Sequence, residues 1–248
     1  MSSATSIFAP CQGVVQLRPR LEDWMVELLC DPKRLRELLA HHGGPLNIQS
    51  AAPFRRNVAA LTECVEAFDV PFLPMFARKA NKCLTYVTTA RDLGIGIDTA
   101  SHAEVAQCLD QDVPGERIVC TAAVKDHDLM VLCATNGVTI ILDNIDEMAL
   151  LEEIAQNNAK TISVGLRLNG FERDGKPLYS RFGFPLTRIP EIAERLSRTP
   201  RIRLGGLHFH LNGYSADDRI AAISQTLPLI DALRGSDRSD FFLDIGGG

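Results

Sequence analysis

A lysine follows a short apolar run in the stretch P-M-F-A-R-K-A-N-K, residues 74–82. An ammonium group near the end of a buried strand costs desolvation free energy unless it is paired, shifted in pKa or used chemically. If residues 71–77 form a strand, Lys79 lies just beyond its carboxyl end, where barrel enzymes carry their catalytic groups. Held in a partly apolar pocket, this amine would be a nucleophile able to form a Schiff base. A lysine that leaves the strand for solvent would give the same pattern, so both interpretations stay open.

A carboxylate ends the next predicted strand. The stretch G-I-G-I-D-T-A-S-H-A-E, residues 94–104, predicts a strand that finishes at Asp98 and a helix that Ser101 and Glu104 cap. Asp98 is therefore a candidate site residue, whereas Ser101 and Glu104 are expected to be structural. The pair G-x-G is weak evidence of nucleotide binding, because the full fingerprint G-x-G-x-x-G is absent.

Two histidines lie two residues apart in G-G-L-H-F-H-L-N-G, residues 205–213. In a strand, His208 and His210 would share one face. Two imidazoles at this spacing can ligate a metal together with groups from other strands, or can lie against a flat aromatic ligand. The spacing itself supplies no further metal ligands, and a buried histidine with one hydrogen bond explains either residue equally well.

Three glycines directly follow the apolar run at residues 241–245: Gly246, Gly247 and Gly248. Glycine adopts left-handed backbone angles freely, and successive N–H groups in such a turn can converge on an anion such as phosphate. A flexible chain end is the alternative.

Short β-type runs alternate with amphipathic helical windows along most of the chain. The runs comprise residues 45–50, 71–77, 94–98, 117–120, 138–143, 161–168, 203–210 and 241–245. This alternation predicts an α/β fold with a parallel sheet and helical crossovers. Eight runs in 248 residues fit a (β/α)₈ barrel, although an open doubly wound sheet has the same local pattern. We expect a helical lead-in over residues 1–43, with a new helix starting at Asp31-Pro32, and one barrel domain over residues 44–248.

Composition excludes several classes of function. The net charge is −5 and no block of basic residues stands out, so neither nucleic acid nor an anionic membrane is an expected partner. The longest apolar stretches, such as residues 138–142, are too short to span a bilayer. The seven cysteines are scattered without a C-x-x-C pair, which predicts a reduced, cytoplasmic protein and argues against a zinc site built from cysteines.

Together these stretches resemble the fold-type III pyridoxal-phosphate decarboxylases of ornithine, diaminopimelate and arginine. F-A-R-K-A-N is similar to the strand that bears the cofactor lysine in that family, and G-I-G-I-D-T-A-S-H-A-E to the segment after it. H-H-G-G-P-L-N-I resembles the opening strand of the family, while G-L-R-L and R-F-G resemble later segments. H-F-H and D-I-G-G-G resemble the stretches that stack on the ring and bind the phosphate. Each motif alone is weak, but their common order along residues 44–248 is specific.

The resemblance implies a TIM (β/α)₈-type barrel, complete or not, with pyridoxal 5′-phosphate at its mouth. The residues that would bind this cofactor are Lys79, Asp98, Arg167, His210, Gly246, Gly247 and Gly248. Lys79 would form the Schiff base, and His210 would lie against the pyridine ring as the other catalytic residue. The three glycines would bind phosphate through their amides. The family usually has H-x-G-S where this chain has H-L-N-G, so a serine that helps to hold the phosphate is replaced here.

The implied activity is decarboxylation of a basic or diamino L-amino acid, a small-molecule substrate, in a homodimer without a metal. The C-terminal β-domain of the family, and the later acidic residue at the pyridine nitrogen, are absent from these 248 residues. Other functions therefore stay open. These are a non-catalytic barrel that binds pyridoxal phosphate and manages its supply, an inactive fragment, an amino-acid racemase and, more distantly, a metal-dependent hydrolase using His208 and His210.

Overall fold

The computed structural model describes residues 21–213, 215–234 and 240–247. Contacts within the chain divide it into two units, residues 1–49 and 50–248, which are described separately. The domain boundary expected near residue 43 stays a prediction.

The described part of the first unit consists of two helices, α1 (Asp23–Leu29) and α2 (Pro32–His42). The carboxylate of Asp31 accepts hydrogen bonds from the backbone N–H groups of Lys33 (3.1 Å) and Arg34 (3.0 Å), which confirms the predicted helix start. The strand predicted for residues 45–50 is wrong, because these residues form no strand. Pro45 has no N–H to donate to a strand ladder.

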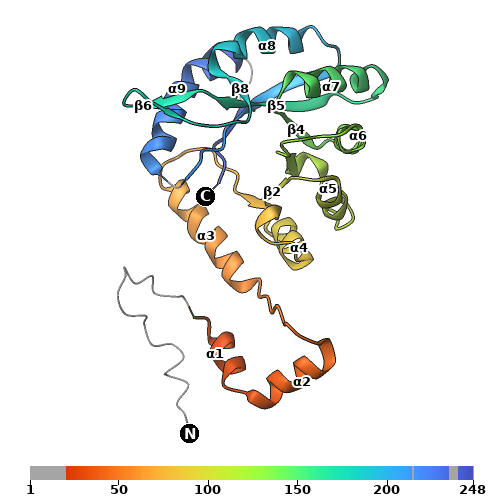
Figure 1. Cartoon of the computed structure of the whole chain (residues 1–248), viewed down its shortest axis with the longest axis vertical. Helices are drawn as coiled ribbons and strands as arrows, with labels where there is room; N and C mark the ends of the chain where they lie inside the picture. The colour runs from red at the N-terminus through yellow and green to blue at the C-terminus, as the bar shows by residue number, and fades with distance from the viewer. Residues whose placement is uncertain (1–20, 214, 235–239, 248) are drawn as a thin grey trace. The chain divides into compact units, whose positions relative to one another are not determined.

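The second unit is built on a parallel sheet whose strands follow in the spatial order β1-β2-β3-β4-β5-β9-β10. These strands are β1 (Met75–Ala77), β2 (Gly96–Thr99), β3 (Ile118–Cys120), β4 (Thr139–Leu142), β5 (Ile162–Asn169), β9 (Ile202–His208) and β10 (Phe242–Asp244). The short strand β8 (Phe184–Pro185) pairs with the end of β5. Seven of the eight predicted runs therefore contain strands. The sheet curls into a half-barrel, with β1 and β10 at its two ends (Figure 1).

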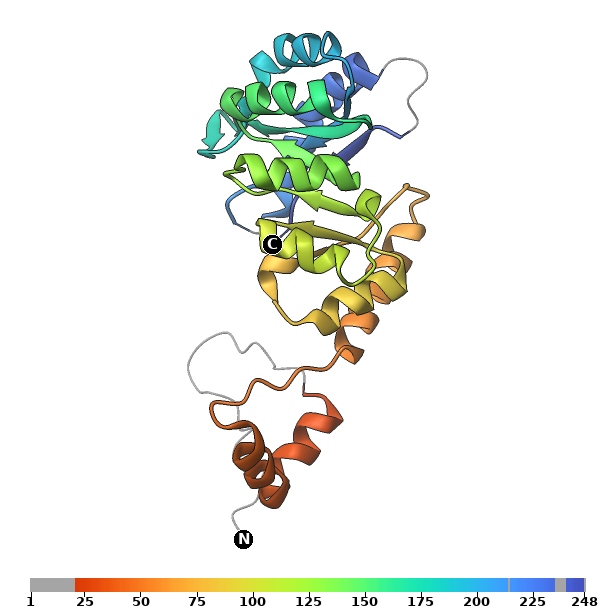
Figure 2. The same cartoon turned by 90° about the vertical axis from the view of Figure 1, so that its right-hand side faces the viewer.

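Helices cover the outer face of this curl. The crossovers contain α4 (Leu84–Leu93), α5 (His102–Leu109), α6 (His127–Asn136), α7 (Ile145–Asn157) and α8 (Ile189–Ser197), while α3 (Ala52–Glu66) precedes the sheet and α9 (Ala216–Arg234) lies between β9 and β10. The described residues also form short 3₁₀ turns, namely η2 (Arg78–Ala80), η3 (Gly115–Arg117) and η4 (Leu186–Arg188). The helices α4 to α8 follow one another around the outside of the sheet (Figures 1 and 2). No helix in the described part of the chain is both long enough and apolar enough to cross a bilayer.

The central strands are buried on both faces, as expected for a parallel sheet under helices. All three residues of β3 are buried, as are three of the four residues of β4. Close approach of β9 and β10 depends on Gly206, because a Cβ atom there would lie 2.5 Å from the ring of Phe242. The register then places His208 opposite Asp244 at the ends of these two strands.

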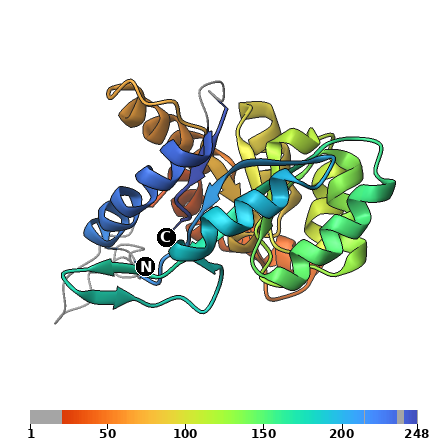
Figure 3. The same cartoon turned by 90° about the horizontal axis from the view of Figure 1, so that it is seen from above.

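A small antiparallel hairpin projects beside α9 (Figure 3). It consists of β6 (Phe171–Arg173) and β7 (Lys176–Leu178), and the sequence analysis did not predict it. Gln225 of α9 fixes the hairpin through both main-chain groups of Glu172, donating to its carbonyl (2.7 Å) and accepting from its N–H (3.1 Å). The hairpin is thus bonded to the middle of α9.

Candidate active site

The carboxyl ends of parallel strands meet at one edge of the sheet, and every described residue of the predicted site lies at this edge. Lys79 follows β1, Asp98 lies in β2, Arg167 in β5, His210 follows β9, and Gly246 and Gly247 follow β10. Gly248, the last predicted phosphate ligand, lies outside the described residues. Adjacent register positions bring Ala77 beside Asp98 and Arg167 beside His208.

Lys79 lies in the 3₁₀ turn η2, which begins at Arg78, directly after the last residue of β1. Arg78 is 1% exposed and its guanidinium bonds to Gln107, so this neighbour points into the protein. Lys79 is itself exposed, contrary to the expected partly apolar pocket, because the strand ends at Ala77 and the turn carries the side chain outward. Its charge acts on both Asp98 and His210, lowering the pKa of each.

Asp98 is held by Thr121, whose hydroxyl donates to Asp98 Oδ1 at 2.5 Å. Burial raises the pKa of Asp98 above its ordinary value, although the Thr121 hydrogen bond and the charge of Lys79 act in the opposite direction. Ser101 and Glu104 cap the next helix as predicted. The Ser101 hydroxyl accepts from the N–H of Glu104 at 3.3 Å, and the Glu104 carboxylate accepts from the N–H of Ala100 at 2.8 Å.

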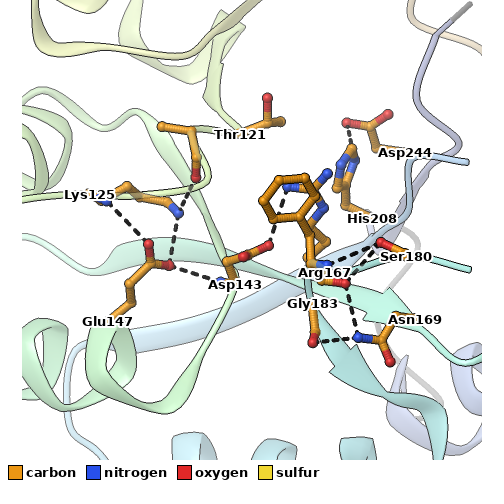
Figure 4. Close-up of polar contacts among 12 residues, drawn as sticks. Thr121, Lys125, Asp143, Glu147, Arg167, Asn169, Ser180, Gly183, His208 and Asp244 are labelled. Atoms are coloured by element: carbon orange, nitrogen blue, oxygen red, sulfur yellow. Dashed lines mark hydrogen bonds and ion pairs between the residues drawn. The ribbon is translucent and has the colours of Figure 1, made fainter. Parts of the chain in front are cut away.

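Arg167 is 7% exposed, and two groups fix its guanidinium. Its Nη1 donates to Asp143 Oδ1 at 3.2 Å, and its Cζ lies 4.5 Å from the centre of the Phe182 ring. The backbone of Gly183 (φ +88°) lies close to the backbone of Arg167, because a Cβ atom at Gly183 would lie 2.7 Å from the Arg167 carbonyl oxygen. The buried Nε of Arg167 has no hydrogen-bond partner among the described residues, so one donor remains available (Figure 4).

A second, fully buried charge cluster lies next to Arg167 and was missed by the sequence analysis. Lys125 Nζ donates to Glu147 Oε2 at 2.8 Å and to the carbonyl oxygen of Ala122 at 2.6 Å (Figure 4). The same carboxylate accepts from the backbone N–H of Asp143 at 2.8 Å. Burial raises the pKa of Glu147, and the charge of Lys125 opposes this effect.

The two predicted histidines have different surroundings. His208 is buried, and its Nδ1 lies 2.9 Å from Asp244 Oδ2. Burial alone would raise the pKa of Asp244, but His208, together with the N–H of Gly246, holds that pKa below its ordinary value. No cluster of three or more potential ligands suited to a metal occurs in the part of the chain that the structure describes.

His210 is half-buried just beyond β9. Burial lowers its pKa first, and the positive charges of Lys79, Arg167 and Arg219, together with an interaction with His208, lower it further. Three lysine and arginine side chains therefore act on one imidazole. A site of this charge favours an anionic ligand.

The glycine turn after β10 differs from the expected cradle in one respect. Gly246 has φ +67°, and a Cβ atom there would lie 2.7 Å from the carbonyl oxygen of Phe209, so only glycine fits. Its N–H group, expected to face phosphate, donates instead to Asp244 Oδ1 at 2.9 Å. Gly247 is open on its Cβ side, and its carbonyl oxygen accepts from Arg219 Nη2 at 2.8 Å.

Three of these features fit an anionic, aromatic, aldehyde-bearing cofactor. An exposed amine, that of Lys79, lies at the edge, a half-buried imidazole of lowered pKa lies within its electrostatic reach, and a glycine turn lies beside a guanidinium. The unpartnered Nε of Arg167 adds a buried donor. A curled parallel sheet with such a site at its carboxyl edge defines an α/β barrel-type protein that binds a cofactor or substrate there.

Comparison with known proteins identifies the family. Residues 53–248 match the sequence model of the pyridoxal-dependent decarboxylases, pyridoxal-binding domain. The chain therefore belongs to this family, and its cofactor is pyridoxal 5′-phosphate. An uncharacterised protein, y4yA of Sinorhizobium fredii, is 33% identical over 215 residues, which cover 84% of this chain and 45% of that protein. A diaminopimelate decarboxylase of Corynebacterium efficiens is 28% identical over 244 residues, covering 92% of this chain and 52% of that enzyme.

A solved structure shares the fold. The crystal structure of a diaminopimelate decarboxylase from M. jannaschi superposes with a TM-score of 0.76 at 21% identity, covering 86% of this chain and 52% of that chain. The chain thus spans about half the length of the relatives it matches.

Proposed function

We propose that this chain is the cofactor-binding portion of an enzyme that removes the α-carboxylate from a basic or diamino L-amino acid, and that Lys79 holds the cofactor covalently. The observation that supports it is the position of Lys79 at the carboxyl edge of a pyridoxal-binding domain, within electrostatic reach of both Asp98 and His210. An exposed primary amine can condense with an aldehyde, with loss of one water, without first breaking an ion pair.

The other residues of the site have separate proposed roles. The half-buried, uncharged imidazole of His210 offers a flat surface for the cofactor ring, since its lowered pKa keeps it neutral at pH 7. Arg167, fixed by Asp143 and Phe182, presents its free Nε as a donor near the ring. Asp98 orders the surroundings of the amine through its bond to Thr121. The bound cofactor supplies the electron sink that a departing carboxylate requires.

The substrate class rests on the relatives. Diaminopimelate decarboxylases recur among the named proteins similar to this chain, and diaminopimelate is the first substrate to test. Action as a homodimer is a further expectation from the family resemblance.

The covalent link can be tested directly. The protein is mixed with pyridoxal 5′-phosphate, reduced with borohydride and digested, and the peptides are weighed by mass spectrometry. We expect the reduced cofactor on Lys79. Lys79→Arg should abolish labelling, whereas the control Lys82→Arg, three residues away and paired with Glu104, should label as the unmodified protein does.

Labelling that survives in Lys79→Arg would refute the covalent role. The reaction itself is tested by release of carbon dioxide from diaminopimelate, ornithine, arginine and lysine. Covalent labelling at Lys79 without release from any of the four would support the alternative in which the domain binds the cofactor and catalyses no decarboxylation.

A further inference from the structure

We propose that Arg219, on the first turn of α9, is a phosphate-binding residue that supplies the charge at the glycine turn after β10. This inference rests on the proposed function in one respect, namely that the cofactor's phosphate lies at this turn. Arg219 belongs to none of the motifs that indicated the site. It lies between β9 and β10, near the start of α9, and the sequence pattern there assigned it no role.

The contact that places Arg219 in the site is with the backbone. Its Nη2 donates to the carbonyl oxygen of Gly247 at 2.8 Å, across 28 residues of sequence. A guanidinium has five N–H donors in a planar fork, so one bond to a carbonyl leaves others for a second acceptor. Apart from the chain neighbours of Gly247, no described heavy atom lies within 4 Å of a Cβ atom built on this residue, so its Cβ side is open.

No carboxylate among the described residues forms an ion pair with Arg219. Among the described residues, its hydrogen bond is with a carbonyl oxygen and not with a carboxylate. The two acids that precede it, Asp217 and Asp218, face Arg173 of the hairpin, at 4.0 Å and 2.5 Å respectively. Arg219 also acts on His210, lowering its pKa, so its charge extends into the site.

The glycine turn needs an added donor. The N–H of Gly246 is occupied by Asp244, which leaves the turn with fewer free amides than a three-glycine cradle would offer. The loop after His210 reads Leu211-Asn212-Gly213 and lacks the hydroxyl of the H-x-G-S pattern. A guanidinium beside Gly247 compensates for both losses, because Arg binds phosphate through charge-assisted and often bidentate hydrogen bonds.

The position of Arg219 is built into the fold. Arg173 of β6 holds the start of α9 through Asp218 and through the hydroxyl of Ser215, to which it donates at 3.1 Å. Gln225, farther along α9, is bonded to both main-chain groups of Glu172. The hairpin therefore fixes the helix whose first turn carries Arg219.

The test compares ligands with and without phosphate. Dissociation constants of pyridoxal 5′-phosphate, of pyridoxal and of inorganic phosphate are measured by absorbance and calorimetry for the unmodified protein, Arg219→Gln and Arg219→Lys. We expect Arg219→Gln to bind pyridoxal phosphate and phosphate about ten- to a hundred-fold more weakly, and pyridoxal within about two-fold, since a charge-assisted hydrogen bond is lost. Arg219→Lys should recover part of the affinity.

The matched control is Arg203→Gln, which removes an exposed arginine that pairs with Asp240 away from the glycine turn. It should leave all three constants unchanged. An equal loss for pyridoxal and pyridoxal phosphate in Arg219→Gln, or no loss for either phosphate ligand, would overturn the inference. If borohydride fails to label Lys79 but inorganic phosphate still depends on Arg219, the proposed covalent role fails while the phosphate site stands.

Discussion

Two lysines follow two strands at the same edge of the sheet, and their surroundings differ completely. Lys79, after β1, is exposed. The side chain of Lys125, after β3, is 0% exposed and forms an ion pair of 2.8 Å with Glu147. If Lys79 holds the cofactor as proposed, burial of an amine is not what indicates its reactivity. The amine of Lys125 is bonded to a carboxylate and a carbonyl group and stabilises the fold. The exposed amine of Lys79 is accessible to an aldehyde.

The buried pair also joins backbone segments. The Glu147 carboxylate accepts from the N–H of Lys125 (3.2 Å) as well as from that of Asp143 (2.8 Å). One side chain on α7 therefore fixes the segments that follow β3 and β4. Asp143 in turn accepts a hydrogen bond from Arg167. The Lys125–Glu147 pair is therefore connected to the candidate site through Asp143.

The largest expected effect separates the two lysines by stability. Lys125→Met leaves the buried Glu147 carboxylate without its cation, and we expect it to lower the free energy of unfolding by about 3–5 kcal/mol. Lys79→Met removes an exposed side chain and should change this free energy by less than about 0.5 kcal/mol. Urea unfolding followed by circular dichroism measures both. Equal losses for the two variants would show that the comparison is false.

A smaller effect is expected when both members of the buried pair are made neutral. Lys125→Met combined with Glu147→Gln removes the uncompensated charge, and the amide oxygen can still accept from one backbone N–H. The double variant should be more stable than Lys125→Met alone by about 1–3 kcal/mol. A double-mutant cycle with Glu147→Gln alone gives the coupling energy. Strict additivity would mean that the ion pair does not account for the loss.

The smallest effect concerns protonation and sharpens the comparison at the site. Lys79→Met should raise the pKa of His210, because the ammonium no longer repels the imidazolium. It should also raise the pKa of Asp98, because the carboxylate loses a stabilising charge. NMR titration of both groups measures these shifts. Lys125→Met should leave the pKa of His210 in place, and a shift of similar size there would argue against a separate role for Lys79.

Much of the sheet could be predicted from local sequence, because each strand is a short apolar run between helical windows. The run at residues 45–50 forms no strand, and Pro45 within it has no N–H to donate to a ladder. The hairpin of β6 and β7 and the two-residue strand β8 were missed because they are too short to show a period. The sequence pattern offered a clue to Lys125, because this charged residue follows the mostly apolar stretch T-A-A-V. Its partner Glu147 lies 22 residues away and could not be identified from local sequence.

The sequence by itself determined the parallel α/β architecture and placed Lys79, Asp98, His210 and the glycines at strand ends, because these features depend on neighbours within a few residues. Only the tertiary structure decided which charges meet. It paired Lys125 with Glu147, turned the amide of Gly246 toward Asp244, and brought Arg219 to Gly247. These contacts join segments that the curl of the sheet and the packing of α9 bring together. Residue patterns within a short window cannot predict which distant side chains will be in contact.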